Sequence, residues 1–329
     1  MFGSRPYALT KNARLMAALG LGLALSAAPA LALDKIKLAI GNPGVGETEV
    51  PDLGMKQGIF QKHGIELEIL YTQGSAETVQ AVVSGGVDVG CAVGTVGALS
   101  AFSKGAPIRI IGASFTGDSN MFLYVPAESP IHRVEDARGK TVAFSNTGSS
   151  SHIMVLEAKK QFETEFKPTA TGGGPATLTQ VMSGQVDVGW SGAPFAVDML
   201  EAGRIRLIMK ASDLTAMGNQ TSRVTTVNVQ ELQKRPDVYA RFMDAYRETI
   251  DWIYDTPEGV KAYADWAKVS ESIGKRSLSE FLPKAAVQTD EVRGLDQNMR
   301  TAMDAKYISA PLTKEQIAEL IQIPARGKK

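Results

Sequence analysis

The sequence has one cysteine, no excess of charge and, beyond its first 32 residues, no long apolar run. Cys91 has no partner for an intrachain disulfide, and its place at the end of an apolar strand favours a small buried residue over a nucleophile. Nothing from Leu33 onward is apolar for long enough to span a bilayer as a helix. The 35 basic and 35 acidic residues are evenly mixed, which excludes the electrostatic footprint of a nucleic-acid-binding protein.

Motifs for metals and nucleotide cofactors are also missing. The three histidines, His63, His132 and His152, are scattered without the spacing of metal ligands, so we expect no metal. The glycines after the first predicted strand are ordered G-x-x-G-x-G, which differs from the dinucleotide fingerprint G-x-G-x-x-G, and no P-loop occurs. We therefore expect no cofactor.

The first 32 residues are typical of an export signal. A basic segment precedes an apolar core from Leu15 to Leu25, and the small-residue cleavage signal Ala30-Leu31-Ala32 follows. The apolar core is too short for a membrane anchor, and no cysteine follows it to accept a lipid. We predict cleavage near Ala32 and a soluble periplasmic protein with 32 basic and 35 acidic residues.

A helix, turn and strand pattern occurs twice, 99 residues apart. TVQAVVSGGVDVG at Thr78 to Gly90 and TLTQVMSGQVDVG at Thr177 to Gly189 share 8 of 13 residues. In each copy an apolar helical run ends at Ser-Gly, and a short β-branched strand with one Asp follows. The period is too long for a solenoid and suits two duplicated α/β lobes with a ligand cleft between them.

The order of predicted elements supports an α/β, two-lobed fold with doubly wound sheets and a helical C-terminal region. We assign residues 33–119 and 226–329 to lobe 1 and 120–225 to lobe 2. Two extended runs, Met121 to Val125 and Ser222 to Val229, would cross between lobes and form a hinge. Beyond Pro236 an apolar stripe with helical spacing predicts core packing. The stripe comprises Tyr239, Phe242, Met243, Tyr246, Ile250 and Ile253. The other predicted strands are 35–40, 67–71, 87–91, 108–113, 141–144, 186–190 and 206–209, and the other predicted helices lie within 52–63, from 75, over 96–103, from about 151 and from 175.

The predicted binding residues lie in loops that follow strands, where open α/β sheets bind ligands. Ser75 is placed to cap a helix, Pro175 occupies a first helical position, and Ser149-Ser150-Ser151 precede the apolar helix that begins at Ile153. Helix N-termini attract anions without a basic side chain. The alternative for each loop is simple capping and turning. Glu47, Glu49 and Asp118 are either solvated or paired with an amine of the ligand. The candidate ligand-binding residues are Asn42, Glu47, Gly74, Ser75, Thr95, Asp118, Asn146, Gly148, Ser149, Ser150, His152, Trp190, Ser191, Gly192 and Phe195.

Four segments carry a resemblance to a known family. Lys56 to Leu67, Gly74 to Gly90, Asp136 to Leu156 and Gly184 to Phe195 are similar to the substrate-binding proteins of ABC importers in the nitrate, sulfonate and taurine group. Their type II periplasmic-binding-protein fold also occurs in pyrimidine-precursor-binding proteins. The resemblance implies a monomer that captures a small anionic sulfonate or carboxylate and hands it to an ABC permease and its ATPase, without chemistry on the ligand.

The sequence departs from the pattern of sulfonate binders at one place. Gly192-Ala193 stands where many of them carry Trp-Asp, and Trp190 is displaced by one position. Removing bulk from the cleft wall predicts a ligand larger than taurine, with a ring stacked on Trp190 or Phe195. Two alternatives remain: a pyrimidine-precursor-binding protein or pyrimidine-synthase-like enzyme on the same fold, and a sensory module that presents its ligand to a receptor.

Overall fold

Strand β1 (Asp34–Gly41) alternates its side chains between two covered faces of a sheet. In this computed structural model, which describes residues 1, 3, 33–44 and 46–327, Leu38 and Ile40 join one apolar core cluster and Ala39 joins another. Burial on both sides is typical of a parallel sheet with helices on both faces. The doubly wound α/β class is thus confirmed. Residues 2 and 4–32 of the predicted export signal lie outside the described residues.

Strand β1 belongs to a five-stranded sheet, called here the large sheet, with the order β2-β1-β3-β10-β4. Strands β1, β2 and β3 are parallel, whereas β10 pairs antiparallel with both β3 and β4. The second extended run is therefore a central strand of the large sheet. The further bounds are β2 (Ile65–Thr72), β3 (Val89–Gly94), β4 (Ile108–Thr116) and β10 (Thr221–Asn228).

The remaining strands, called here the second sheet group, repeat this order. A three-stranded sheet β8-β5-β9 and a pair β6-β7 are joined by a bridge between Val142 and Val188. The resulting order β7-β6-β8-β5-β9 matches that of the large sheet, with antiparallel β5 in the place of β10. The duplication seen in the sequence thus extends to the whole topology. The bounds are β5 (Met121–Pro126), β6 (Thr141–Phe144), β7 (Lys167–Ala170), β8 (Gly189–Gly192) and β9 (Ile205–Lys210).

Residues that are identical in the two copies of the repeated segment make equivalent hydrogen bonds. The Thr78 hydroxyl lies 2.7 Å from that of Thr72, and the Thr177 hydroxyl lies 2.7 Å from that of Thr171. Asp88 Oδ2 accepts from Lys37 N–H, and Asp187 Oδ2 accepts from Thr141 N–H, both at 2.9 Å. Each Asp therefore fastens its loop to the neighbouring parallel strand, so β3 and β8 begin after the Asp and not before it as predicted.

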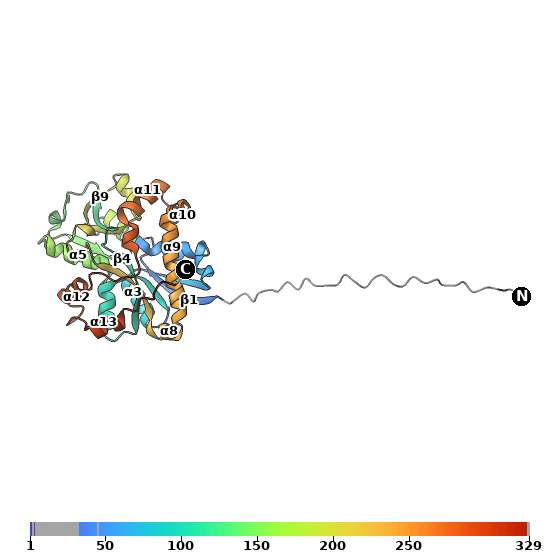
Figure 1. Cartoon of the computed structure of the whole chain (residues 1–329). Coiled ribbons are helices and arrows are strands. Elements are labelled where there is room, and N and C mark those ends of the chain that lie inside the picture. The colour runs from blue at the N-terminus through green and yellow to red at the C-terminus, as the bar shows by residue number, and fades with distance from the viewer. Residues whose placement is uncertain (2, 4–32, 45, 328–329) are drawn as a thin grey trace. The chain divides into compact units, whose positions relative to one another are not determined.

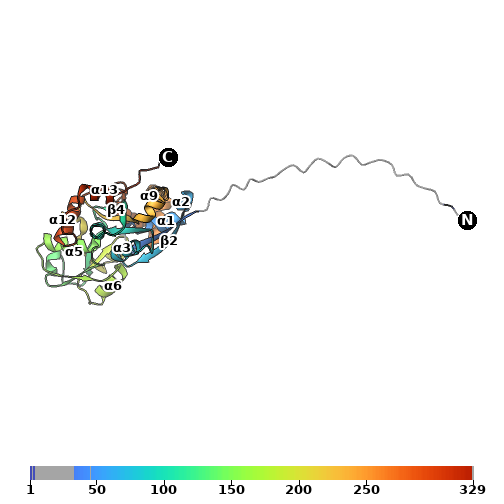
Figure 2. The ribbon, with the colours of Figure 1, turned by 90° about the horizontal axis from the view of Figure 1, so that it is seen from below.

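The helices cover both faces of the large sheet. Helices α3 and α4 pack on one face, and α1, α2 and α9 on the other. The predicted apolar stripe lies on α9 and is buried throughout. Figure 1 shows α9, α10 and α11 together in orange, and Figure 2 shows α12 and α13 on the side away from α6. The bounds are α1 (Val50–Lys56), α2 (Ile59–Lys62), α3 (Ser75–Val83), α4 (Thr95–Ser103), α5 (Ser150–Gln161), α6 (Gly174–Met182), α7 (Val197–Glu201), α8 (Val229–Lys234), α9 (Pro236–Asp255), α10 (Pro257–Ala267), α11 (Glu271–Arg276), α12 (Leu295–Asp304) and α13 (Lys314–Leu320).

Two local features differ from the sequence predictions. The helix expected within 52–63 is divided into α1 and α2, because Gly58 adopts a left-handed φ of 77°. Strand β7 was not predicted, since Lys167–Ala170 contains a proline and is largely exposed. Thr221 and Arg223, which lie before the predicted lobe boundary at 225, pair within the large sheet. The lobe assignment stays a prediction.

Candidate functional site

A buried cavity lies between the ends of the large-sheet strands and the start of α5. Its volume is about 20 Å³, which is room for about one water molecule. Six of the predicted ligand-binding residues line it: Asn42, Glu47, Ser75, Ser149, Ser150 and Trp190. The other lining residues are Gly41, Thr48, Ala92, Met121, Ser151 and Arg223. Because the wall comes from both the large sheet and the second sheet group, this cavity is the candidate site.

Arg223 is the central charged group of the site. Its Nε donates to Glu47 Oε1 (2.9 Å), and its Nη2 donates to Asn120 Oδ1 (2.8 Å). Its Nη1 donates to Ser150 Oγ (3.3 Å), and its guanidinium lies 4.6 Å from the centre of the Phe115 ring. The side chain of Arg223 is only 8% exposed. The site thus contains a buried basic side chain that was not among the predicted binding residues.

Sequence reasoning missed Arg223 because it looked for binding residues in loops. Arg223 lies inside β10, a strand whose eight residues are all buried. An arginine in such a strand needs an acidic or polar partner, since a lone buried charge is very costly. A single basic residue in the run TSRVTTVN was the available signal.

Asp118 is a second buried acid near Arg223, close to Nη1, whereas Glu47 binds Nε. Asp118 Oδ1 lies 3.8 Å from Arg223 Nη1 and accepts a hydrogen bond from the Ser222 hydroxyl. Burial raises the pKa of Asp118 to about 7, and the attraction of Arg223 opposes this rise only in part. Burial also raises the pKa of the fully buried Glu49 well above its ordinary value. Neither residue lines the cavity.

Replacing Asp118 by asparagine is expected to change the pH dependence of stability. Between its ordinary pKa of 3.8 and about 7, Asp118 binds more proton in the folded than in the unfolded chain. Its contribution therefore favours folding at low pH and is lost as the pH rises from about 4 to about 7. Asp118→Asn removes that loss and should raise the free energy of unfolding at pH 8 relative to wild type. Urea titrations at pH 5 and pH 8 measure it, and an equal pH dependence in both proteins contradicts it.

Two serines of the site, Ser75 and Ser149, accept hydrogen bonds from backbone N–H groups. Ser75 is the first residue of α3 and not its cap, and its Oγ accepts from Gly94 N–H at 2.7 Å. Ser149 does cap α5, because its Oγ accepts from His152 N–H at 3.1 Å. Pro175 is the second residue of α6, one position later than expected. Ser149 thus fits the capping alternative, while Ser150 contacts Arg223.

Four predicted residues lie at the rim, where the two sheet groups meet. Asn146 Oδ1 accepts from Ala76 N–H (3.3 Å), which links the loop after β6 to α3 next to Gly74. Gly148 faces Gly94, and a Cβ placed on Gly94 would lie 2.6 Å from the Gly148 carbonyl oxygen. Thr95 donates its hydroxyl to the Thr221 carbonyl (2.8 Å). Asn146 thus joins the two parts beside the cavity, whereas the Thr95 bond lies within the large-sheet part, and none of the four residues lines the cavity.

His152 and Cys91, the two residue types typical of catalysis, do not line the cavity either. His152 Nδ1 lies 2.7 Å from Tyr307 Oη, and its ring centre lies 4.3 Å from that of Phe144. Burial lowers the pKa of His152 to about 4, so it is neutral near pH 7. Burial raises the pKa of the Cys91 thiol to about 12, which confirms a buried residue without thiolate reactivity.

The wide cleft predicted from Gly192-Ala193 is absent from this structure. Trp190 and Met121 form the wall, and Trp190 is 1% exposed. Gly192 is the buried last residue of β8 and pairs with Met121. Ser191 donates its hydroxyl to the Phe195 carbonyl (2.9 Å), and the Phe195 ring packs near Gly174. Bulk at 192 would therefore disturb a strand, contrary to the expectation that this position is a free cleft loop.

Several polar atoms in the cavity wall find no hydrogen-bond partner among the residues that the structure describes. They are Asn42 Oδ1, Glu47 Oε2, Thr48 Oγ1 and Trp190 Nε1. Buried polar atoms are normally satisfied, and leaving one unpaired costs about 1–3 kcal/mol. Together these atoms offer acceptors and a donor to a molecule in the cavity. Within the described part of the chain, no three His, Cys, Asp or Glu side chains are grouped to hold a metal ion.

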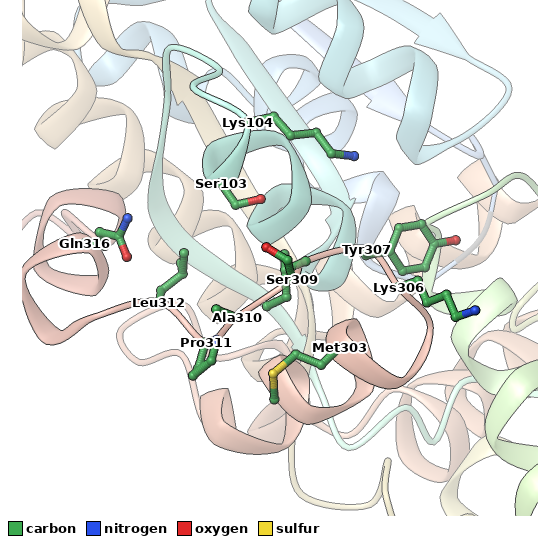
Figure 3. Close-up of a pocket in the computed structure, with 11 residues that line it drawn as sticks. Ser103, Lys104, Met303, Lys306, Tyr307, Ser309, Ala310, Pro311, Leu312 and Gln316 are labelled. Atoms are coloured by element: carbon green, nitrogen blue, oxygen red, sulfur yellow. The ribbon is translucent and has the colours of Figure 1, made fainter.

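A larger groove of about 680 Å³ lies elsewhere, at the ends of α4 and α12. Figure 3 shows Tyr307 and Lys306 on one side of it and Pro311 and Leu312 on the other. None of the predicted binding residues lines this groove. Size alone therefore does not identify the site.

The fold and the cavity define a class of protein, the periplasmic-binding-protein fold with its site between two α/β parts. An alkanesulfonate-binding protein from Xanthomonas axonopodis, solved with bound MOPS, has a TM-score of 0.72 at 17% identity, covering 88% of this chain and 98% of that one. Similarity at that identity concerns the fold. No helix in the described residues is long and apolar enough to cross a membrane.

The chain belongs to the family described as NMT1/THI5 like, whose model matches residues 53–260. It is 27% identical over 172 residues to a putative aliphatic sulfonates-binding protein of Escherichia coli, across 51% of this chain and 53% of the relative. It is 19% identical over 232 residues to the yeast 4-amino-5-hydroxymethyl-2-methylpyrimidine phosphate synthase THI12, across 65% of each. The match thus spans between about half and two thirds of these relatives.

Proposed function

We propose that this protein is a periplasmic solute-binding protein that captures one small organic ligand per chain for an ABC permease and its ATPase. The observation that carries the proposal is the cavity between the two sheet groups, whose buried wall presents polar atoms without partners. A ligand that supplies those partners stabilises the form in which the two parts meet.

The proposed ligand has an anionic or strongly accepting end. Trp190 Nε1 is a buried donor with no partner among the described residues, and α5 begins at the cavity with Ser150 and Ser151 in its first turn. The N–H groups of a helix N-terminus favour an anion, and the twelve-residue length of α5 gives it a full dipole. A sulfonate or carboxylate oxygen suits these donors.

Ligand entry requires the two parts to separate, because the cavity is closed and far smaller than an organic acid. Near the cavity, the hydrogen bonds that join them include Gly46 N–H to the Ala193 carbonyl (2.8 Å), Ala76 N–H to Asn146 and Arg223 Nη1 to Ser150 Oγ (3.3 Å). The segments before β5 and before β10 are the proposed hinge. The lobe assignment, the monomeric state and export with cleavage near Ala32 belong to the same proposal.

The synthase-like alternative has less support from the site. The cysteine is inert and the histidine near the site is neutral and held by Tyr307, so neither is placed to attack or protonate a ligand in the cavity. We therefore propose binding without chemistry. Incubating the protein with a bound ligand and analysing the products tests this point, and uptake measured after deletion of the protein tests the sensory alternative.

The central experiment is a thermal and calorimetric screen of the mature protein with sulfonates, carboxylates and nitrate, alongside mass spectrometry of co-purifying molecules. We expect one site per chain and, at 100 times the dissociation constant, about 2.7 kcal/mol of added stability. Small-angle scattering should show a smaller radius with ligand. A ligand that binds at one site yet leaves both melting point and radius unchanged would contradict closure on the ligand.

A further inference from the structure

The charge arrangement around Arg223 gives the cavity no positive excess for a simple anion. Arg223 is matched by Glu47 at 2.9 Å and faces Asp118 at 3.8 Å. The basic group nearest the cavity is thus already compensated, and two opposite charges at such distances largely cancel beyond their own contact. A ligand carrying only negative charge would gain little from this pair.

Glu47 offers the opposite kind of contact. The residue is 2% exposed, its Oε1 is bound by Arg223, and its Oε2 has no partner in the described residues although it belongs to the cavity wall. The buried Asn42 Oδ1, in the same wall, is a second acceptor without a donor. A carboxylate oxygen can only accept, so a ligand atom beside it must be an N–H or O–H donor. Positively charged N–H groups make the stronger bond.

We propose that Glu47 and Asn42 form a subsite for a nitrogen N–H donor of the ligand, so that the protein selects amine-bearing molecules over simple anions. The inference rests on the proposed solute-binding function. The donor end of the ligand contacts Glu47 Oε2 and Asn42 Oδ1, and its acceptor end contacts Trp190 Nε1 and the start of α5. An aminoalkyl acid and an aminopyrimidine both present this N–H chemistry.

Calorimetry with matched pairs of probes tests the subsite on the mature protein. The pairs are taurine and ethanesulfonate, β-alanine and propionate, and 4-amino-5-hydroxymethyl-2-methylpyrimidine and the same ring without its amino group. We expect one amine-bearing member to bind about 10- to 100-fold more tightly than its partner, which is the range of one hydrogen bond to a charged group. The pair that discriminates also distinguishes the two ligand sources.

Glu47→Gln is the variant that isolates the contact. Glutamine keeps an oxygen for Arg223 Nε but replaces Oε2 by an amide that donates, so the preference for the amine should disappear. Glu49→Gln is the matched control, because Glu49 is the neighbouring buried acid in the same turn (Gly46–Glu49) and lies outside the cavity wall. The control should keep the preference, and melting curves verify that both variants are folded.

The outcomes separate the two proposals. If molecules bind wild type but no amine-bearing member binds more tightly than its partner, or if Glu47→Gln retains the amine preference, the Glu47 subsite is overturned while solute binding stands. If none of the six molecules binds, solute binding of these classes is overturned, and the subsite with it. If Glu49→Gln loses the amine preference as Glu47→Gln does, the preference comes from the total negative charge of residues 46–49. That result would overturn the proposed contact between Glu47 and the ligand.

Discussion

Replacing Arg223 by methionine is expected to lower the free energy of unfolding by about 3–5 kcal/mol, because it leaves the Glu47 carboxylate buried without its partner. Methionine replaces the unbranched apolar stem of arginine and removes the guanidinium, so the loss of the charge dominates the change. Urea unfolding followed by tryptophan fluorescence measures it.

Two further variants separate the charge effect from general damage. Adding Glu47→Gln to Arg223→Met should restore part of the lost stability, since the unpaired charge is then removed as well. Arg300→Met is a matched control, because Arg300 is exposed and, in the described part of the chain, its side chain hydrogen-bonds to Gln297 of its own helix. Its effect should stay within about 0.5 kcal/mol. A loss below 1 kcal/mol in Arg223→Met would mean that Glu47 is neutralised without the arginine.

Gly94→Ala is expected to weaken ligand binding by about 100-fold or more while leaving the fold stable. A 100-fold loss of affinity corresponds to about 2.8 kcal/mol of binding free energy. The backbone of Gly94 (φ −58°, ψ 127°) is allowed for alanine. The added Cβ, however, would lie 2.6 Å from the Gly148 carbonyl oxygen and 3.2 Å from Ser149 Cα, across the junction of the two sheet groups. Those atoms are backbone, so relief requires the two parts to move apart.

Calorimetry measures the affinity, and small-angle scattering and melting curves report whether the two parts close on the ligand. Gly94→Ala should show a larger scattering radius with ligand than wild type and a melting point that responds less to ligand. Gly86→Ala is the control, since its Cβ would make ordinary contacts of 3.4 and 3.5 Å within its own turn. Wild-type affinity in Gly94→Ala would show that this junction is not closed when ligand is bound.

The fold was predictable because its signals are local. The repeated segment at Thr78 and Thr177, the glycine stops after it and the apolar stripe of α9 each depend on residues close in sequence. The position of β10 in the sheet was harder to predict, because placing it between β3 and β4 depends on pairing between residues about 105 to 138 positions apart. A run of β-branched residues predicts a strand but not its neighbours.

The site was predictable only in outline. The loops after strands bring Asn42, Ser75 and Ser150 to one cavity, since the ends of parallel strands meet at one edge. The ion pair of Glu47 with Arg223 joins residues 176 positions apart, and no local pattern announces it. Rotations of side chains, such as that of His152 toward Tyr307, depend on packing that a sequence does not display.

The insertion of β10 into the large sheet has a consequence for how the chain is made. Strand β4 reaches the rest of its sheet through β10, whose residues follow those of the whole second sheet group. During synthesis from the N-terminus, the large sheet therefore lacks β10 until residues 221–228 have been made. Pairing between residues so far apart in sequence is slow, because the entropy cost of closing the loop comes before any stabilising contact forms. Strand β10 is therefore the last strand to enter the large sheet, after every strand of the second sheet group has been made.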